Sequence, residues 1–295
     1  NLQEQYRIIS ENGVDIDSLF RHFSISLKEK LLRKYVAPSL ACVPTTFRYM
    51  ITDIAKRRRN PSRKPVLSYP LDFPENRLLA DRLAAKNLKP WWGKKVALCL
   101  SHDVDNDEGY SFVETMAAMN REAGIPGTFN FLTNDNYKID DGLLYRLLDD
   151  GMEIGLHGYR HDQGFSFRSA RFMDRRLRQA LSRLEGFGVT GTRSPALSKS
   201  EAFFNALSRA GIKYDSTMQV GSGIYHSVRM PYPYYYEEFG LWEIPLMIQD
   251  DNYFRDAAAG ENEVLCSLGI FIEQTVRLNG VMVLNMHPHL MTHRV

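Results

Sequence analysis

The chain has 295 residues, of which 44% are apolar and 24% are charged, a composition typical of a globular protein with a sizeable core. No run approaches the roughly 18 consecutive apolar residues that a membrane-spanning helix needs. The net charge of +2 is unevenly divided: residues 1–93 carry 17 Lys and Arg against 9 Asp and Glu, a net of +8, and residues 94–295 carry a net of −6.

Residues 1–93 form the basic part of the chain. Residues 26–37 and 47–59 look helical, and the four prolines of residues 60–76 predict an extended connection. The run Lys56–Arg59 is typical of a solvated helix end, and it could also contact anionic lipid or polysaccharide. It lacks the interleaved aromatic residues of a nucleic-acid surface. We predict a mainly helical, basic accessory segment, with peripheral membrane contact as one role and no nucleic-acid partner.

Two features predict where the protein resides. The first residues include Glu4 and Glu11 and lack the apolar region of a signal peptide. The three cysteines, Cys42, Cys99 and Cys266, are odd in number and far apart, which argues against a disulfide framework. We expect a cytoplasmic protein.

From Val96 onward, short apolar runs alternate with helical stretches. The expected strands cover residues 96–100, 127–132, 152–156, 189–193, 212–217, 241–248 and 281–286. The expected helices cover residues 111–124, 141–151, 169–187, 200–211 and 263–280. This alternation predicts an α/β fold with a parallel sheet, and about seven strands favour a barrel over an open sheet.

Three carboxylates and a histidine stand within residues 100–107, directly behind the first strand. Asp103 and Asp105 are two positions apart, so near a strand end their side chains point to one side and Val104 points to the other. Active sites of barrels lie at this end of the strands. A pair of this kind is more often a turn or a cap, but a metal ion or a proton-transfer role would explain why repelling carboxylates converge.

A histidine pair follows another predicted strand. His157 and His161 are four apart, so one helical turn would place both imidazoles on one face, where they could bind one metal ion. The same spacing recurs at His289 and His293, so spacing alone is a weak indication.

Arg193 and His287 also stand at the ends of predicted strands. A buried arginine in such a place usually pairs with a carboxylate. Each of these residues alone has a structural explanation. The Asp pair, the His pair, Arg193 and His287 together follow apolar strands of one parallel set, which predicts a single catalytic site.

The order of these motifs resembles the polysaccharide deacetylase superfamily, the NodB-homology proteins of carbohydrate esterase family 4. The resemblance covers residues 94–295 and rests on KKVALCLSHDVD, EIGLHGYRH, GTRSP and VLNMHPH. It implies a distorted (β/α)7 barrel that binds one divalent metal ion, here expected to be zinc. The aspartates form a D-x-D variant, with Val104 between residues that are adjacent in the commoner form. Some amidases of the superfamily share this variant.

The resemblance also implies a role for each residue. Asp105, His157 and His161 would bind the metal, Asp103 would be the catalytic base, and Arg193 would orient Asp103 and hold it ionised.

His287 would then be the general acid. Pro195, in the third motif, and Asp215 are predicted to contact the substrate, and Asp215 could help to tune His287. The implied activity is removal of an N-acetyl group from a sugar of a surface polysaccharide or its precursor. Two alternatives remain: an allantoinase-like ring amidase or amino-sugar deformylase, and a barrel that only binds carbohydrate.

Overall fold

The computed structural model describes residues 7–8, 11, 71, 73–220, 226–228, 230–250 and 261–291 of the chain. The helices expected at residues 26–37 and 47–59, the basic run Lys56–Arg59 and His293 lie outside these residues. No helix within the described ranges is long and apolar enough to cross a membrane.

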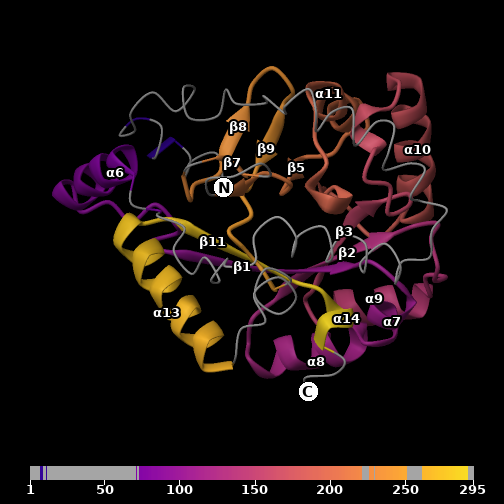
Figure 1. Ribbon diagram of the computed structural model, residues 1–295, viewed down its shortest axis with the longest axis horizontal. Coiled ribbons are helices and arrows are strands. Elements are labelled where there is room, and N and C mark those ends of the chain that lie inside the picture. The colour runs from indigo at the N-terminus through magenta and orange to yellow at the C-terminus, as the bar shows by residue number, and fades with distance from the viewer. Residues whose placement is uncertain are drawn as a thin grey trace, which may run out of the picture.

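Strands and helices alternate in residues 97–209, and six strands then precede the helix of residues 261–278 (Figure 1). The strands are β1 (Ala97–Val104), β2 (Gly127–Leu132), β3 (Glu153–Gly158), β4 (Gly191–Thr192), β5 (Tyr214–Asp215), β6 (Gln219–Val220), β7 (His226–Val228), β8 (Tyr234–Tyr236), β9 (Leu241–Glu243), β10 (Ile248–Gln249) and β11 (Val281–Met286). The helices are α6 (Pro74–Ala85), α7 (Asp107–Ser111), α8 (Val113–Glu122), α9 (Asp141–Asp149), α10 (Ala170–Arg183), α11 (Glu201–Arg209), α13 (Glu261–Leu278) and α14 (Pro288–Met291), with 3₁₀ turns at Phe165–Phe167 and Pro195–Leu197.

One nine-stranded sheet in the order β10-β11-β1-β2-β3-β4-β5-β9-β8 forms the centre of the described fold. Its neighbouring strands run parallel, except for β8 and β9, which are antiparallel. Helices cover the outer side of the curled sheet (Figure 1). The predicted α/β class is confirmed, and the sheet is a curled half-barrel consistent with the distorted (β/α) barrel.

The curl of the sheet follows from the short link between β9 and β10. These strands lie at opposite sides of the parallel set, yet only Ile244–Met247 separates them in the chain. Eight flat strands would place them about 34 Å apart, whereas the link can span at most about 18 Å. The two sides must therefore approach each other. Leu246 bridges part of the gap through backbone hydrogen bonds with Met218 and Val220.

The prediction of a single strand at residues 241–248 is wrong, because this run forms two strands. Ile244 N donates to Asp215 O on one side of the half-barrel, and Met247 N donates to Val283 O on the other. Pro245 stands between them and has no N–H to continue a ladder. The described sheet therefore has eight parallel strands rather than seven.

The helix expected at residues 111–124 begins earlier and is interrupted. Asn106 caps α7, since its side-chain oxygen accepts a hydrogen bond of 2.8 Å from Gly109 N. Phe112 separates α7 from α8. Gly124 follows α8 with a φ of 67°, a left-handed conformation that glycine adopts without strain.

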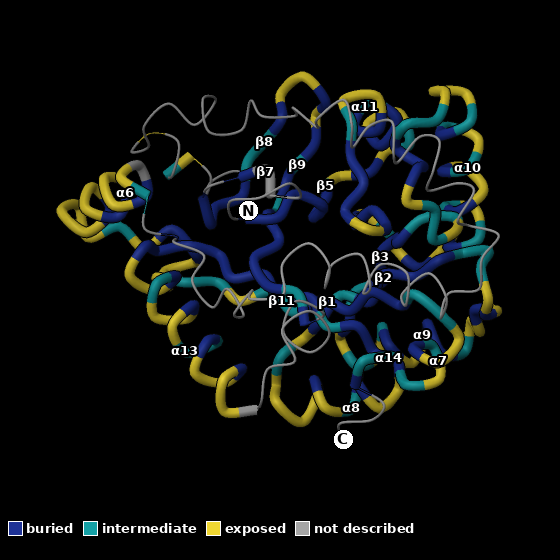
Figure 2. The backbone as a smooth tube through the Cα atoms, viewed as in Figure 1, coloured by how far each residue is buried: buried dark blue, intermediate teal, exposed yellow. Residues whose placement is uncertain are grey.

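The core is continuous from α6 into the half-barrel, and buried strands lie inside exposed helix surfaces (Figure 2). Leu83 of α6 is buried, and Trp91 is 1% exposed and donates its Nε1–H to Asn279 O at 2.7 Å. Pro74 begins α6, although residues 60–76 were expected to be extended, because a proline is tolerated at the first position of a helix. Leu83 and Trp91 thus share a core with the strands that follow them, and the domain boundary expected between residues 93 and 94 stays a prediction.

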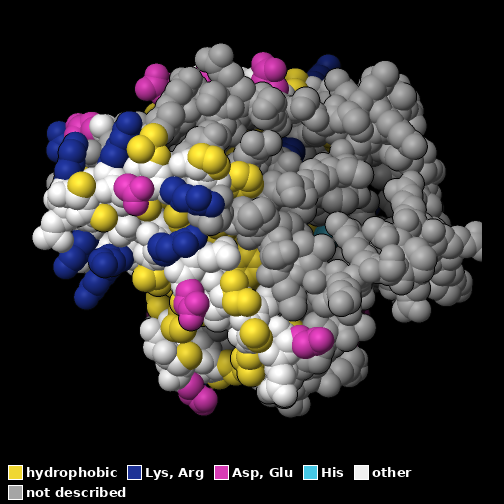
Figure 3. Space-filling model, turned by 60° about the vertical axis from the view of Figure 1, so that its left-hand side comes forward, with side chains coloured by type: hydrophobic (Ala, Val, Ile, Leu, Met, Phe, Trp, Pro, Cys, Tyr) yellow, Lys and Arg dark blue, Asp and Glu magenta, His cyan; other side chains and the backbone are white. Residues whose placement is uncertain are grey.

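Figure 3 shows the face of the molecule that lies at the left of Figure 1. Lys and Arg side chains gather toward the left of this view, with hydrophobic side chains beside and below them. The exposed hydrophobic residues of the adjoining helices include Leu78 of α6 and Leu265, Ile272 and Val276 of α13. The described part of the basic segment is thus partly apolar at its surface.

Candidate active site

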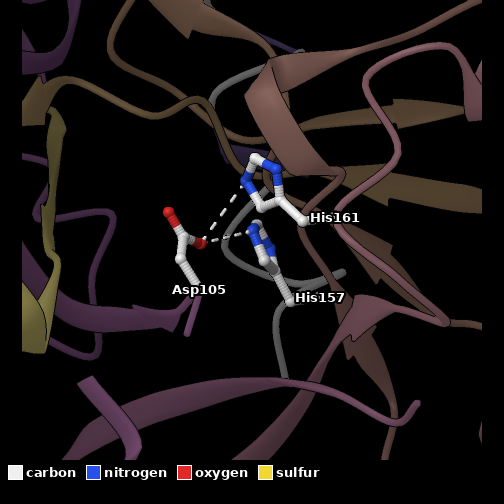
Figure 4. A group of neighbouring side chains, drawn as sticks. All are labelled: Asp105, His157 and His161. Atoms are coloured by element: carbon white, nitrogen blue, oxygen red, sulfur yellow. Dashed lines mark ion pairs between the residues drawn. The ribbon is translucent and has the colours of Figure 1, made fainter. Parts of the chain in front are cut away.

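Asp105, His157 and His161 bring three potential metal ligands together (Figure 4). One ligand atom from each residue lies within 4.8 Å of the others. Asp105 Oδ1 is 3.0 Å from His157 Nε2 and 3.6 Å from His161 Nε2. The three residues come from the end of β1, from β3 and from the loop after β3, all at the carboxyl end of the sheet.

A loop, rather than the predicted helical turn, brings the two histidines together. His157 lies within β3, and the chain turns at Gly158, whose φ of 114° suits glycine. His161 follows in an irregular segment, and its backbone N donates to Asp135 Oδ2 at 2.7 Å. The ring centroids of His157 and His161 are 5.6 Å apart. His157 and His161 thus face one point, but an irregular loop places them there rather than the helical turn that was predicted.

The state of the donor atoms fits a metal ion. His157 Nδ1 is 2.8 Å from the carbonyl oxygen of Arg193, so in the neutral ring this nitrogen carries the proton and Nε2 carries a lone pair. That lone pair faces Asp105 Oδ1, which is buried and accepts no hydrogen bond. Two electron-rich atoms 3.0 Å apart repel each other unless a cation or a proton lies between them. Two imidazoles and one carboxylate form a donor set that zinc binds.

The electrostatics of the cluster favour a cation as well. Burial raises the pKa of the Asp105 carboxyl, but the neighbouring His161, His157 and His287 outweigh burial and hold the pKa well below its usual range. Burial lowers the pKa of His157, but Asp103 and Asp105 outweigh burial and raise it. The negative potential that attracts a proton to His157 would attract a metal ion equally.

Asp103 lies beside the cluster with both carboxylate oxygens in hydrogen bonds. Oδ1 accepts from Asn130 Nδ2 at 2.8 Å and from Arg193 Nη1 at 3.1 Å, and Oδ2 accepts from Asn285 Nδ2 at 2.8 Å. A carboxylate has about four acceptor positions, so one remains, on Oδ2. Burial raises the pKa of Asp103, but Arg193, with His157 and His287, outweighs burial and lowers it, so this carboxylate is ionised at neutral pH.

Arg193 is 1% exposed, and its side chain is held by atoms from two strands, β1 and β11, and from the segment after β5. Its Nη1 also donates to Ser101 Oγ at 2.8 Å and to Asn285 Oδ1 at 2.9 Å. Its Nε and Nη2 donate to the backbone oxygen and the hydroxyl of Ser216, at 2.8 and 2.9 Å. All three guanidinium nitrogens donate hydrogen bonds, so the group is fixed beside Asp103, and its predicted role in orienting that carboxylate stays a prediction.

His287 follows β11 and is held by Asp250, which directly follows β10. His287 Nδ1 is 2.6 Å from Asp250 Oδ1, and the His287 backbone N donates to Asp250 Oδ2 at 2.6 Å. His287 Nε2 is 3.9 Å from Asp105 Oδ2, so the other ring nitrogen faces the ligand cluster. The sequence suggested Asp215 as the partner of His287. The carboxylate that fills this place is Asp250.

Asp215 and Pro195 lie behind the site rather than on its surface. Asp215 is fully buried, and it accepts from Thr217 N at 3.0 Å and from Thr217 Oγ1 at 2.7 Å. Thr217 Oγ1 accepts in turn from Ser194 N at 3.0 Å. Pro195 is buried as well. The structure thus gives both residues a supporting position, and the predicted substrate contact does not match their burial.

A pocket opens above these groups at the carboxyl end of the sheet. It is lined by Asp103, Asp105, His157, His161, Gln163, Ser194, Ala196, Leu197, Gln249, His287, His289 and Leu290. The predicted base, ligands and general acid therefore border one space that a substrate can enter.

Comparison with known proteins agrees with the motifs. Residues 100–214 match the family described as polysaccharide deacetylase. The match covers less than half of the chain, and over that range the chain is similar to this family. The matched range includes Asp103, Asp105, His157, His161 and Arg193, and it ends before Asp250 and His287.

Solved structures share the fold at low sequence identity. A polysaccharide deacetylase homologue from Mycobacterium smegmatis is 19% identical, with a TM-score of 0.55 over 67% of this chain and 78% of that chain. The PuuE allantoinase is 13% identical, and a polysaccharide deacetylase homologue from Pseudomonas aeruginosa PAO1 is 14% identical, each with a TM-score of 0.50 over 67% of this chain and 79% of the other. No curated protein matches the chain.

Sequence reasoning missed several residues of this candidate site. Asn130 and Asn285 are buried amides in otherwise apolar strands, and both donate to Asp103. Strand register places them there, because Asp103 pairs with Asn130 and Ser101 pairs with Asn285. In the sequence, the indication of each residue was a single polar side chain inside an apolar strand. Asp250 had no such signal, because it follows a strand of two residues.

Proposed function

We propose that the protein is a metal-dependent hydrolase that removes an N-acetyl group from a sugar of a surface polysaccharide or its precursor. The observation that carries this proposal is the convergence of Asp105, His157 and His161 with Asp103 and His287 around one pocket. The family match supports deacetylation of a carbohydrate. The acyl group, the sugar and the metal dependence belong to the proposal.

Asp105, His157 and His161 are the residues that would hold the metal ion, and we propose zinc. A divalent ion held there would supply Lewis-acid activation of water and of the acyl carbonyl. The Nδ1–H of His157 keeps its Nε2 available as a ligand by donating to the Arg193 carbonyl.

Asp103 takes the proton of the attacking water as the water oxygen bonds to the acyl carbon. Its Oδ2 has the unfilled acceptor position, and Asn130, Asn285 and Arg193 keep the carboxylate from rotating. A positioned base of this kind contributes about 10²–10⁴ to the rate.

His287 donates a proton to the departing nitrogen as the carbon–nitrogen bond breaks, which yields acetate and a free amine. Asp250 binds the Nδ1 side, so that the protonated Nε2 faces the pocket. An amine is a poor leaving group without this proton, which is why the site needs an acid and a base on separate residues.

The second candidate is a ring amidase of the allantoinase type or an amino-sugar deformylase. The D-x-D spacing of Asp103 and Asp105 favours it, because some amidases share that variant. A barrel that only binds carbohydrate would lack a ligand or a proton carrier, and all of these residues line the pocket here. Cytoplasmic location and membrane contact through the basic segment stay predictions.

A substrate panel separates the candidates. The zinc-loaded protein is incubated with an N-acetylated chito-oligosaccharide, an N-formyl amino sugar and allantoin, and acetate, formate and allantoate are measured. Release of acetate from the oligosaccharide, absent in Asp105→Ala, is the expected result. Turnover of allantoin or of the formyl sugar in place of the oligosaccharide would favour the second candidate, and turnover of none would favour a binding barrel.

A further inference from the structure

Two glutamines at the pocket wall have no role in the chemistry described above. Gln163 lies in the loop after β3, and Gln249 is the last residue of β10. Within the described residues, neither carboxamide has a hydrogen-bond partner in the protein. Gln163 is exposed and Gln249 is half-buried, and both line the pocket, so their carboxamides are available to a molecule bound there.

Strand register fixes the direction of Gln249. It pairs with Asn285 on the parallel neighbour β11, and Asn285 in turn pairs with Ser101 on β1. Residues in register on neighbouring strands point to the same face of a sheet. Asn285 and Ser101 both point inward, toward Asp103 and Arg193, so Gln249 points inward beside them. The next residue, Asp250, is tied to His287, which leaves Gln249 little freedom to move.

Gln163 is held on the other side of the ligand cluster. It stands two residues after His161, whose backbone is tied to Asp135. Asp162 closes the turn, because its N donates to Arg160 O at 2.7 Å and its Oδ1 accepts from Gly164 N at 2.9 Å. The loop therefore presents Gln163 to the pocket from a fixed backbone.

We propose that Gln163 and Gln249 are specificity-determining residues that bind hydroxyl groups of a sugar on either side of its acylamino group. A carboxamide donates and accepts hydrogen bonds at once, which matches neighbouring hydroxyls that do the same. The other pocket residues outside the ligands and proton carriers include the apolar Ala196, Leu197 and Leu290. This inference rests on the proposed function, because it names the substrate class that the same site selects.

The test replaces each carboxamide by a side chain of similar length that cannot hydrogen-bond in this way. Gln163→Met, Gln249→Met and the double variant are compared with the wild-type protein on an N-acetylated chito-oligosaccharide and on p-nitrophenyl acetate, which has no hydroxyl groups. Gln179→Met is the matched control, since Gln179 is exposed on α10.

We expect kcat/KM on the oligosaccharide to fall about tenfold for Gln163→Met and for Gln249→Met, chiefly through KM, because one hydrogen bond of this kind contributes about a factor of ten. Hydrolysis of p-nitrophenyl acetate and the zinc content should stay within about twofold of the wild type.

A binding measurement keeps this inference separate from the proposed function. Calorimetric titration of the oligosaccharide into the Asp103→Asn protein, with and without each Met substitution, needs no turnover. Weaker binding in both Met variants, with unchanged binding in Gln179→Met, supports the inference even if the wild type hydrolyses another bond. Equal affinity in all proteins, or equal kcat/KM on the oligosaccharide, would overturn it. If the wild type neither hydrolyses nor binds the oligosaccharide, the proposed function and the inference both fall.

Discussion

Asp103 and Asp105 are identical side chains two positions apart, and their surroundings give them different chemistry. Asp103 accepts hydrogen bonds from Asn130, Asn285 and Arg193. Asp105 Oδ1 has no donor and faces His157. The family resemblance implied that Asp103 is the base and Asp105 a ligand, but the residues alone did not give the physical reason, because the amides that surround Asp103 come from distant strands.

The two aspartates should respond differently to substitution. Asp103→Asn should keep the metal and lose about 10²–10⁴ in kcat, because the amide fills the same space but cannot take a proton. Asp105→Ala should lose both metal and activity. Elemental analysis beside turnover measures both effects. Loss of the metal in Asp103→Asn, with its retention in Asp105→Ala, would mean that the two roles are exchanged.

His102 gives the fold a predictable sensitivity to acid. It is buried, its Nε2 is 2.9 Å from Asn120 Nδ2, and burial lowers its pKa from 6.5 to about 4. The unfolded chain binds a proton here below about pH 6.5, while the folded chain does so only near pH 4. Stability is therefore full above pH 6.5 and falls as the pH drops toward 4, by up to about 3 kcal/mol.

The His102→Gln variant should show a flatter loss of stability across this range, because the amide does not titrate. Urea unfolding at pH 7 and pH 4.5 measures the difference. An equal slope in the wild type and the variant would show that other groups cause the acid sensitivity.

At the scale of elements, long apolar runs were predicted well and short strands were not. Residues 127–132 and 281–286 were expected as strands and form β2 and β11 with the same bounds. β4, β5, β9 and β10 have two or three residues each, and the position of each depends on its neighbour in the sheet rather than on its own pattern. For this reason the sequence could not foresee that Asp250, after β10, would reach His287.

The pairing of β5 with β9 places two buried carboxyl groups together. Asp215 and Glu243 are in register and both are 0% exposed. Burial raises the pKa of Asp215 to about 6, and burial together with the Asp215 charge raises that of Glu243 well above its usual range. The raised pKa of Asp215 contributes to the free energy of unfolding. This contribution is complete below about pH 4 and is lost as the pH rises through 6.

Glu243→Gln should therefore stabilise the protein at pH 8, by about 1–3 kcal/mol, and give little gain at pH 5. The amide oxygen can still accept from Met218 N, as Glu243 Oε1 does at 3.0 Å. Calorimetric melting at the two pH values measures this. A variant that is less stable at pH 8 would show that the pair is favourable when charged.

At the scale of the whole molecule, α6 and the barrel share one core. Leu83 and Trp91 are buried, and α6 packs near α13. The boundary at residue 93 was predicted from the change in charge, which describes the surface and not the packing beneath it, so this boundary stays a prediction.

A truncation measures the contribution of α6. Residues 71–295 should melt cooperatively, whereas residues 94–295 should lose about 5 kcal/mol or more, because several large apolar side chains lose their burial. Thermal melting and zinc content compare the two proteins. Equal stability of the two proteins would instead support the predicted boundary between residues 93 and 94.

The central claim is that the cluster of Asp105, His157 and His161 supports hydrolysis through a bound metal ion. The most direct measurement is acetate release from an N-acetylated chito-oligosaccharide by chelator-treated protein, before and after addition of one molar equivalent of Zn²⁺. We predict that the treated wild type is inactive, that one equivalent restores its activity, and that Asp105→Ala stays inactive throughout. Undiminished acetate release without metal, or full activity of Asp105→Ala, would contradict the claim.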